Sequence, residues 1–165
     1  MKLFSNEIVF RGHPDKVCDQ ISDAILDECL RQDKYSRVAV ETMGGKCKIF
    51  VTGEITTNAK LDVEQIIKGV LVDIGYNADN YEIVNNIGKQ SSDIALGVDI
   101  GGAGDQGMMF GYACNDTEEL LPLAQVILQR LSKEYYGLTK RFSDFLADGK
   151  AQITGYYDED FKLIK

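Results

Sequence analysis

The sequence predicts an α+β fold made of two-layer units, each an antiparallel or mixed sheet with helices on one face, with the second unit incomplete. Up to Ile87 the periodicities run helix, strand, strand, helix, strand, which is typical of helices packed on one side of a sheet. A glycine-rich stretch between Gly88 and Gly111 then precedes a further helix and strands. With 165 residues, 44% of them hydrophobic and 27% charged, the chain can bury a core.

The first element is an amphipathic helix over Asp15–Gln32. Its apolar residues recur three and four positions apart, as one helix face requires: Val17, Ile21, Ala24, Ile25 and Cys29. Pro14 and Asp15 suit a helix start, because proline fits the first turn and the helix dipole favours a carboxylate there.

A β-hairpin follows the first helix. Two strand-like runs, Arg37–Met43 and Lys46–Ile55, stand on either side of Gly44 and Gly45. In the second run Ile49 and Val51 alternate with polar residues, which is the period of a half-buried strand. Two strands separated by a short glycine turn predict a hairpin.

A second helix starts near Asp62 and a short strand closes the first unit. Asp62 and Gln65 have the spacing of a capping box, and the apolar helical period lasts until Gly75. The strand covers Tyr81–Ile87. The run from Gly88 to Gly111 is a long loop, and long loops in compact domains are often functional.

The last part of the chain predicts one helix and two strands. The helix spans about Asp116–Tyr136, with Asn115 and Glu118 placed to cap its start and Gly137 at its end. A strand over Ala151–Tyr157 and a turn over Asp158–Asp160 come next. Phe161–Lys165 begins another strand for which the sequence offers no obvious partner.

Charge and composition narrow the possible partners. The net charge of −8 argues against nucleic acid or an anionic membrane. No run of about 18 apolar residues and no signal-peptide core is present, so we expect a cytoplasmic location. The cysteines form no Cys-x-x-Cys pair and the chain has one histidine, so a structural zinc site is not expected.

That single histidine, His13, stands at the start of the first helix. The run Gly-His-Pro-Asp-Lys at residues 12–16 sets an imidazole, a carboxylate and an ammonium group beside a helix N-terminus, where backbone N–H groups favour anions. The pattern suits a phosphate chain that carries a metal ion. The alternative from these five residues alone is an ordinary capped helix start.

Four segments together resemble the S-adenosylmethionine synthetases. They are Gly-His-Pro-Asp-Lys at 12–16, Thr-Gly-Glu-Ile-Thr-Thr at 52–57, Ile-Gly-Lys-Gln-Ser-Ser-Asp-Ile at 87–94, and Gly-Ala-Gly-Asp-Gln-Gly-Met-Met-Phe-Gly-Tyr-Ala at 102–113. Their order and spacing are similar to the family from residue 3 to about 158. The resemblance implies an N-terminal domain over 1–97 and an incomplete central domain over 98–165 that begins with the last segment.

The family joins the sulfur of L-methionine to C5′ of ATP and expels triphosphate, which it hydrolyses to phosphate and diphosphate. The resemblance implies Mg²⁺ and K⁺ as cofactors and gives catalytic roles to His13, Lys16 and Asp105. His13 would donate a hydrogen bond to the triphosphate near the breaking C5′–O bond, and Lys16 would face phosphate oxygens. Asp15 would bind Mg²⁺, and Asp105 would lie close to both substrates.

Other positions match the family's binding residues. Glu41 matches the potassium site, Glu54 and Gln90 match methionine-binding residues, and Asp148 and Lys150 match a segment that contacts ATP. Without the resemblance, each of these would be interpreted as an exposed strand, loop or turn residue.

Three departures from the family pattern stand out. Phe10 and Arg11 replace a small residue and a glutamate before Gly12, so a base stands where the family has an acid. The stretch 97–102 is shorter than the family's gating loop. Residues 137–147 do not follow the family's Leu-Pro-Trp-Leu-Arg-Pro pattern, which bears on Asp148 and Lys150.

Family members are more than twice as long as this chain, and their sites lie between two subunits. The resemblance therefore implies the N-terminal portion of a synthetase, active with the missing C-terminal portion. We expect a homodimer, a higher homo-oligomer or a complementary C-terminal subunit, with no nucleic-acid or membrane partner. The alternative, motivated by the short loop and Arg11, is a non-catalytic nucleotide-binding or interaction module derived from the family.

Overall fold

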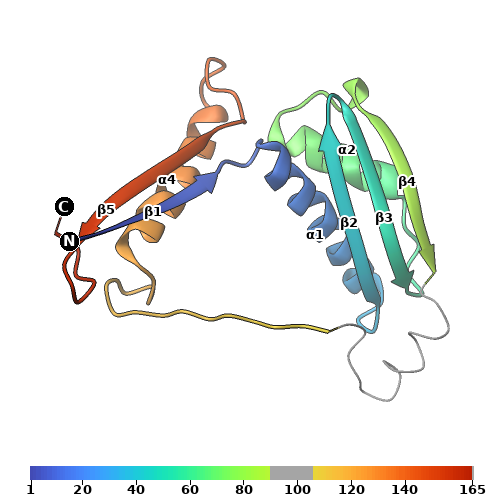
Figure 1. Cartoon of the computed structure of the whole chain (residues 1–165). Helices are drawn as coiled ribbons and strands as arrows, with labels where there is room; N and C mark the ends of the chain where they lie inside the picture. The colour runs from blue at the N-terminus through green and yellow to red at the C-terminus, as the bar shows by residue number, and fades with distance from the viewer. Residues whose placement is uncertain (90–105, 165) are drawn as a thin grey trace. The chain divides into compact units, whose positions relative to one another are not determined.

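The computed structural model describes residues 1–89 and 106–164. The chain forms two compact units: Met1–His13 with Phe110–Lys165, and Pro14–Met109. Each packs helical structure on one small sheet, with one described helix in the first unit and two α-helices in the second, so the predicted α+β class is confirmed (Figure 1). Among the described residues no helix is long and apolar enough to cross a membrane.

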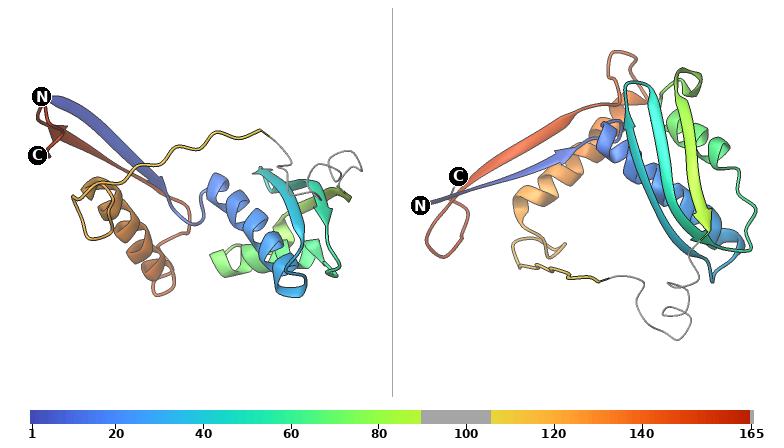
Figure 2. Two further views of the ribbon diagram at one scale, coloured as in Figure 1. Left: turned by 90° about the horizontal axis from the view of Figure 1, so that it is seen from below. Right: turned by 45° about the vertical axis from the view of Figure 1, so that its right-hand side comes forward.

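The unit Pro14–Met109 is a three-stranded sheet with two helices on one face. Its elements are, in order, α1 (Pro14–Gln32), β2 (Arg37–Gly45), β3 (Lys48–Thr56), α2 (Val63–Ile74), the 3₁₀ turn η1 (Ala78–Asn80) and β4 (Glu82–Lys89). The strand order is β2-β3-β4, with β2 antiparallel and β4 parallel to β3. Figures 1 and 2 show α1 and α2 against the same face, and within the described part of this unit no helix covers the opposite, open face of the sheet.

The core of this unit lies between that helical layer and the sheet. Its fully buried side chains come from both helices and from β3: Ile21, Ile25, Cys29, Ile49, Val51, Ile67 and Leu71. The predicted start of α2 is confirmed, since Asp62 Oδ1 accepts from the Gln65 N–H at 3.0 Å. Gly75 ends α2 with φ 111°, in the left-handed region that favours glycine.

The hairpin turn lies two residues later than predicted. Gly45 pairs with Lys48, so Gly44 and Gly45 end β2, and Lys46 and Cys47 form the turn. Both turn residues have positive φ, 48° and 58°, as a type I′ turn requires. The prediction was wrong because it placed the turn at the two glycines, whereas the pairing of the two strands places it at Lys46 and Cys47.

The unit Met1–His13 with Phe110–Lys165 holds a two-stranded sheet and one helix. β1 (Lys2–Val9) pairs antiparallel with β5 (Lys150–Tyr157), from Lys2 opposite Tyr157 to Val9 opposite Lys150. The helix α4 (Leu123–Thr139) packs on both strands and buries Ala124, Val126 and Leu128. β1 was not predicted, because its partner lies about 150 residues away in the sequence.

α4 starts later and ends later than predicted. Pro122 occupies its N-cap, because a proline further inside would remove a helix hydrogen bond and clash with the preceding turn. Asn115 and Glu118 therefore do not cap it. The helix also continues through Gly137 to Thr139, and Lys140 N–H donates to Tyr136 O at 3.3 Å.

The chain after β5 turns back on β5 itself. Asp158 Oδ1 accepts from the N–H of Asp160 at 3.0 Å and of Lys162 at 2.8 Å, which confirms the predicted turn. Beyond the turn, the described residues up to 164 form one isolated antiparallel bridge, between Leu163 and Tyr157. The prediction of a strand without a partner is therefore wrong. The segment forms a bridge instead, and its partner is β5.

The predicted loop 88–111 lies mostly outside the described residues. Gly88 itself belongs to β4, which runs to Lys89. The described residues 106–114 have no regular secondary structure.

Candidate functional site

The turn that carries His13 is bonded to the segment before β5. Phe10 N–H donates to Gly149 O at 2.8 Å and Gly12 N–H donates to Ala147 O at 2.9 Å. His13 N–H donates to Phe10 O at 3.0 Å, which closes the turn. These bonds extend the β1–β5 pairing beyond both strands.

This pairing brings together two motifs that lie more than 130 residues apart in the sequence. His13, which is half-buried, stands on one side of it, and the exposed Asp148 and Lys150 stand on the other. The Nζ of Lys150 lies 3.0 Å from Glu7 Oε2 on β1. Three residues predicted for the ATP side of the site therefore share one unit and one sheet edge.

Two glycines allow this close approach. A Cβ on Gly12 would lie 2.5 Å from the carbonyl carbon of Ala147, and a Cβ on Gly149 would lie 2.5 Å from Cδ2 of Phe10. Carbon atoms without a bond between them do not approach so closely, so only glycine fits at either position with this backbone.

Asp15 and Lys16 lie in the first turn of α1. The helix starts at Pro14, one residue before the predicted Asp15, and the exposed Asp15 is favoured there by the helix dipole. The Nζ of Lys16 lies 2.9 Å from Asp19 Oδ2. Both side chains are largely exposed, and such pairs are weak, so the Lys16 ammonium can exchange Asp19 for another anion at small cost.

Cys18 lies on the next part of α1, with its Sγ 3.3 Å from the place of a Cβ on Gly44. Burial raises the pKa of the Cys18 thiol, and the carboxylates of Asp15 and Asp19 raise it further. Burial that raises a thiol pKa is typical of a packed cysteine rather than a reactive one.

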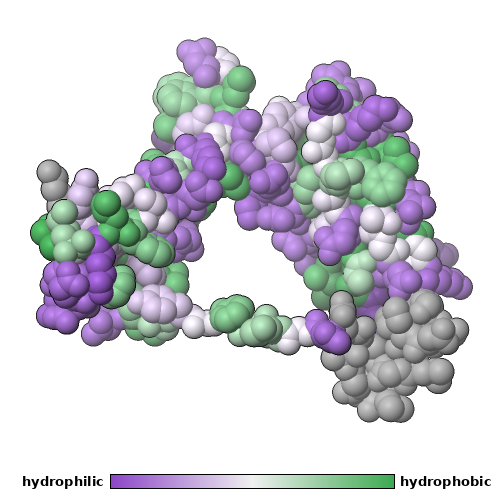
Figure 3. All heavy atoms as spheres, viewed as in Figure 1, coloured by the Kyte–Doolittle hydropathy of each residue, from purple (hydrophilic) through white to green (hydrophobic). Residues whose placement is uncertain are grey.

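Glu41 and Glu54 share the open face of the three-stranded sheet. Residues opposite each other on paired strands point to the same face, and Glu41 stands opposite Thr52, two positions from Glu54. The alternate residues Val51 and Ile55 are buried under the helices. Glu41 is exposed and Glu54 half-buried. Figure 3 shows hydrophilic and hydrophobic residues side by side over this sheet.

Two polar residues on the same face, Thr52 on β3 and Asn86 on β4, were not among the predicted site residues. Asn86 on β4 stands opposite Thr52, and its Nδ2 donates to Thr52 Oγ1 at 3.2 Å. The alternation of Ile49 and Val51 with polar neighbours already placed Thr52 on the outward side. The pairing of β3 with β4, which brings Asn86 there, had no signal in the sequence.

The predicted Gln90 and Asp105 lie outside the described residues. Within the described part of the chain, no three His, Cys, Asp or Glu side chains are grouped so as to hold a metal ion. Asp15 and Glu41 each offer single carboxylate oxygens, the donors that Mg²⁺ and K⁺ prefer. One carboxylate suits a Mg²⁺ ion that is held mainly by substrate phosphates and water.

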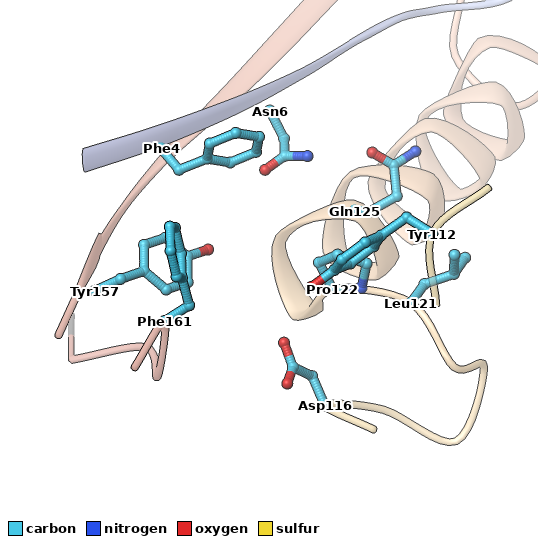
Figure 4. Close-up of a pocket in the computed structure, with 9 residues that line it drawn as sticks. All are labelled: Phe4, Asn6, Tyr112, Asp116, Leu121, Pro122, Gln125, Tyr157 and Phe161. Carbon is cyan, nitrogen blue, oxygen red and sulfur yellow. The ribbon is translucent and has the colours of Figure 1, made fainter. Parts of the chain in front are cut away.

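A groove of about 600 Å³ opens in the unit Met1–His13 with Phe110–Lys165, and it contains none of the predicted site residues. In Figure 4 its aromatic walls come from Phe4 on β1, Tyr157 on β5, and Tyr112 and Phe161. The Oδ1 of Asn6 is buried in its lining and has no hydrogen-bond partner among the residues that the structure describes. The groove is chemically distinct from the charged turn at His13.

Comparison with known proteins gives two consecutive family matches. Residues 1–93 match the S-adenosylmethionine synthetase N-terminal domain, and residues 100–165 match the central domain of the same family. The chain is 43% identical over 178 aligned positions to the S-adenosylmethionine synthase of Brachyspira hyodysenteriae (strain ATCC 49526 / WA1), covering 94% of this chain and 45% of that protein. It is 45% identical over 165 positions to the S-adenosylmethionine synthase of Mycoplasmopsis synoviae (strain 53), covering 96% and 43%. The chain thus spans less than half the length of these curated relatives.

Proposed function

Because this chain belongs to the S-adenosylmethionine synthetase family, we propose that it is the N-terminal portion of such an enzyme. Together with the C-terminal portion that its relatives carry, it would form S-adenosylmethionine from ATP and L-methionine, with release and hydrolysis of triphosphate. One structural observation supports this most directly: the turn at His13 is hydrogen-bonded to the segment that holds Asp148 and Lys150.

On the ATP side, the chain's task is to hold the triphosphate while it leaves C5′. His13 donates a hydrogen bond to the oxygen nearest the breaking bond, where negative charge grows. Lys16 exchanges Asp19 for a phosphate oxygen, and Asp148 and Lys150 contact ATP from the segment that is hydrogen-bonded to the turn of His13. The sulfur and C5′ need alignment rather than covalent help from the protein.

On the methionine side, we assign the carboxylate of Glu54 to the substrate's ammonium group. The half-buried position of Glu54 supports this, because a partly desolvated carboxylate binds a cation more strongly than an exposed one. Gln90, which follows the end of β4, would bind the polar end of methionine. Asp105 would lie close to both substrates.

The metal ions belong to the same proposal. Asp15 would hold Mg²⁺ and Glu41 would hold K⁺, since both offer hard oxygen ligands. When bound, Mg²⁺ supplies positive charge that neutralises the leaving triphosphate. The ion pair of Lys16 with Asp19 is weak, so the Lys16 ammonium can turn toward the phosphate chain that carries the metal ion.

We also propose a domain boundary between residues 97 and 98, with an incomplete central domain over 98–165. The gap between the two family matches, 1–93 and 100–165, supports this position. The partner would be a second copy of the chain, a higher homo-oligomer or a complementary C-terminal chain.

Calorimetric titration of methionine in the presence of Mg-ATP, into the chain mixed with the C-terminal portion, tests the substrate assignment. We expect Glu54→Gln to weaken methionine binding about tenfold or more, because a charge-assisted contact is lost. Glu64→Gln is the matched control, since Glu64 pairs with Lys68 on the surface of α2. Equal affinity of wild type and Glu54→Gln would contradict the assignment.

A second candidate function is a non-catalytic nucleotide-binding module. Arg11 favours it, because a base stands before Gly12 where the family resemblance implies a glutamate. This candidate predicts Mg-ATP binding without any S-adenosylmethionine, even when the C-terminal portion is present.

A further inference from the structure

The side chains of the two residues before Gly12 pack against helix α4. The guanidinium carbon of Arg11 lies 4.5 Å from the ring centroid of Tyr136. Phe10 is 7% exposed, and its ring centroid lies 4.6 Å from that of Tyr135, with the two planes at 31°. These adjacent side chains therefore contact adjacent tyrosines on one helix.

Helix α4 is also fastened to the segment that pairs with the turn. The Tyr135 hydroxyl donates to Leu146 O at 3.0 Å, and the edge of the Tyr135 ring meets Phe145 at 5.9 Å. Leu146 immediately precedes the residues that accept the backbone hydrogen bonds of Gly12 and Phe10. Each of these three parts, the turn, α4 and the segment 145–149, therefore contacts the other two.

The side chain of Arg11 is directed to an aromatic ring. A guanidinium stacks on a ring as a flat cation, which a lysine ammonium does not do. The Nζ of Lys140 lies 5.1 Å from the same Tyr136 ring, so a second cation already faces it. This placement gives Arg11 a structural contact at the position where the family resemblance implies a glutamate.

We propose that Arg11 and Tyr136 are positioning residues that hold the turn carrying His13 on α4. This inference rests on the function proposed above, in which His13 donates to the leaving triphosphate. His13 N–H is bonded to Phe10 O, one residue from Arg11, so a displaced Arg11 moves the His13 backbone with it. A shift of about 1 Å at a reacting group can lower a rate about a hundredfold.

The first test needs no activity. His13 is the only histidine in the chain, so an ¹⁵N-labelled sample gives a single set of imidazole signals at one fixed pH. We expect Arg11→Ala and Tyr136→Leu to shift or broaden that set. Tyr136→Phe keeps the aromatic ring, so it should leave the imidazole signals unchanged. Arg130→Ala should leave them unchanged as well, because it removes an exposed arginine of α4 that pairs with Glu119.

Unchanged His13 signals in folded Arg11→Ala and Tyr136→Leu would overturn the inference, whether or not the chain proves to be part of a synthetase. Arg11→Lys is the second variant in case Arg11→Ala does not fold. It keeps the charge and loses the flat stack, so the inference predicts a shift for it as well.

The second test is a double-mutant cycle on S-adenosylmethionine formation by the chain mixed with the C-terminal portion. We expect Arg11→Ala and Tyr136→Leu each to lower kcat about tenfold or more with little change in KM for ATP. The double variant should lose no more than either single variant. A raised KM in Arg11→Ala alone, with Tyr136→Leu unaffected, would show instead that Arg11 binds phosphate directly. A wild-type mixture without activity would count against the proposed function alone, since the imidazole signals still decide the positioning role.

Discussion

His13 is the residue on which the proposed chemistry depends, and its position follows from its neighbours. Gly12 allows the backbone to reach Ala147, and Phe10 accepts the His13 N–H. The short motif predicted a helix start beside an anion site. The contact with the segment 147–149 could not be predicted, because it joins residues far apart in the sequence.

His13→Ala should slow the chemical step more than it weakens ATP binding. The hydrogen bond of the imidazole is expected to strengthen as the leaving triphosphate gains charge, and loss of one such donor costs about a hundred- to a thousandfold in rate. Single-turnover rates and ATP affinities, measured on the chain mixed with the C-terminal portion, give the two quantities. Equal losses in both would assign His13 to ground-state binding.

Gly12→Ala should destabilise the unit that holds the turn by about 1–3 kcal/mol, as overpacking usually does. The new Cβ would meet backbone atoms of Ala147 at 2.5 Å, and backbone yields less easily than a flexible side chain. Gly69→Ala on α2 is the control, because nothing lies within 4 Å of its Cβ position. There alanine should stabilise the helix by about 0.5–1 kcal/mol. Urea unfolding followed by circular dichroism measures both, and a neutral Gly12→Ala would contradict the packing described.

At the scale of elements, local signals predicted well and long-range pairing did not. α2 was found because Asp62 caps it and Gly75 ends it, both within its own sequence. β1 was missed because its residues, mostly exposed or half-buried, become a strand only by pairing with β5. The predicted start of α4 was too early. Pro122 occupies the N-cap, because a proline further inside a helix removes a backbone hydrogen bond, so the apolar residues before it lie outside the helix.

Among the site residues, the sequence placed Asp15 and Lys16 correctly in the first turn of a helix. It also placed Glu41 and Glu54 on strands, but only the register of β2 and β3 puts them on one face. Arg11 was recognised as a departure from the family pattern. Its contact with Tyr136 required the structure, since α4 lies more than 100 residues further along the chain.

The connection after α1 should make stability depend on pH in the acid range. Asp33 accepts from the Asn58 N–H at 2.9 Å and from the Tyr35 N–H at 3.0 Å, so it ties this connection to the one after β3. These hydrogen bonds hold the pKa of Asp33 below its ordinary value of about 3.9, and the bond from Asn58 has the largest effect. The contribution of Asp33 is therefore complete above about pH 4 and is lost as the pH falls through the lower folded pKa.

Urea midpoints at several pH values from 7 to 3 measure this dependence. Asp33→Asn removes the titrating group, so its midpoint should fall less steeply than that of the wild type below about pH 4. Asp23→Asn, at an exposed position on α1, should keep the wild-type slope. An identical slope in all three proteins would show that Asp33 does not govern the acid response.

At the scale of the whole molecule, the proposed site residues fall in two structural units. The unit with Phe110–Lys165 holds His13, Asp148 and Lys150, and the unit Pro14–Met109 holds Asp15, Lys16, Glu41 and Glu54. The chain covers 45% and 43% of the length of the two relatives, which is why we propose that the C-terminal portion of such a protein completes the site.

The central claim is that this chain supplies part of a working S-adenosylmethionine synthetase site. The most direct measurement is the formation of labelled S-adenosylmethionine from labelled methionine and Mg-ATP, by the chain mixed with the C-terminal portion of a relative. We predict product from the mixture, and little or none from either part alone or from a mixture that contains His13→Ala. A mixture that binds Mg-ATP yet forms no product would contradict the claim and leave a nucleotide-binding module in its place.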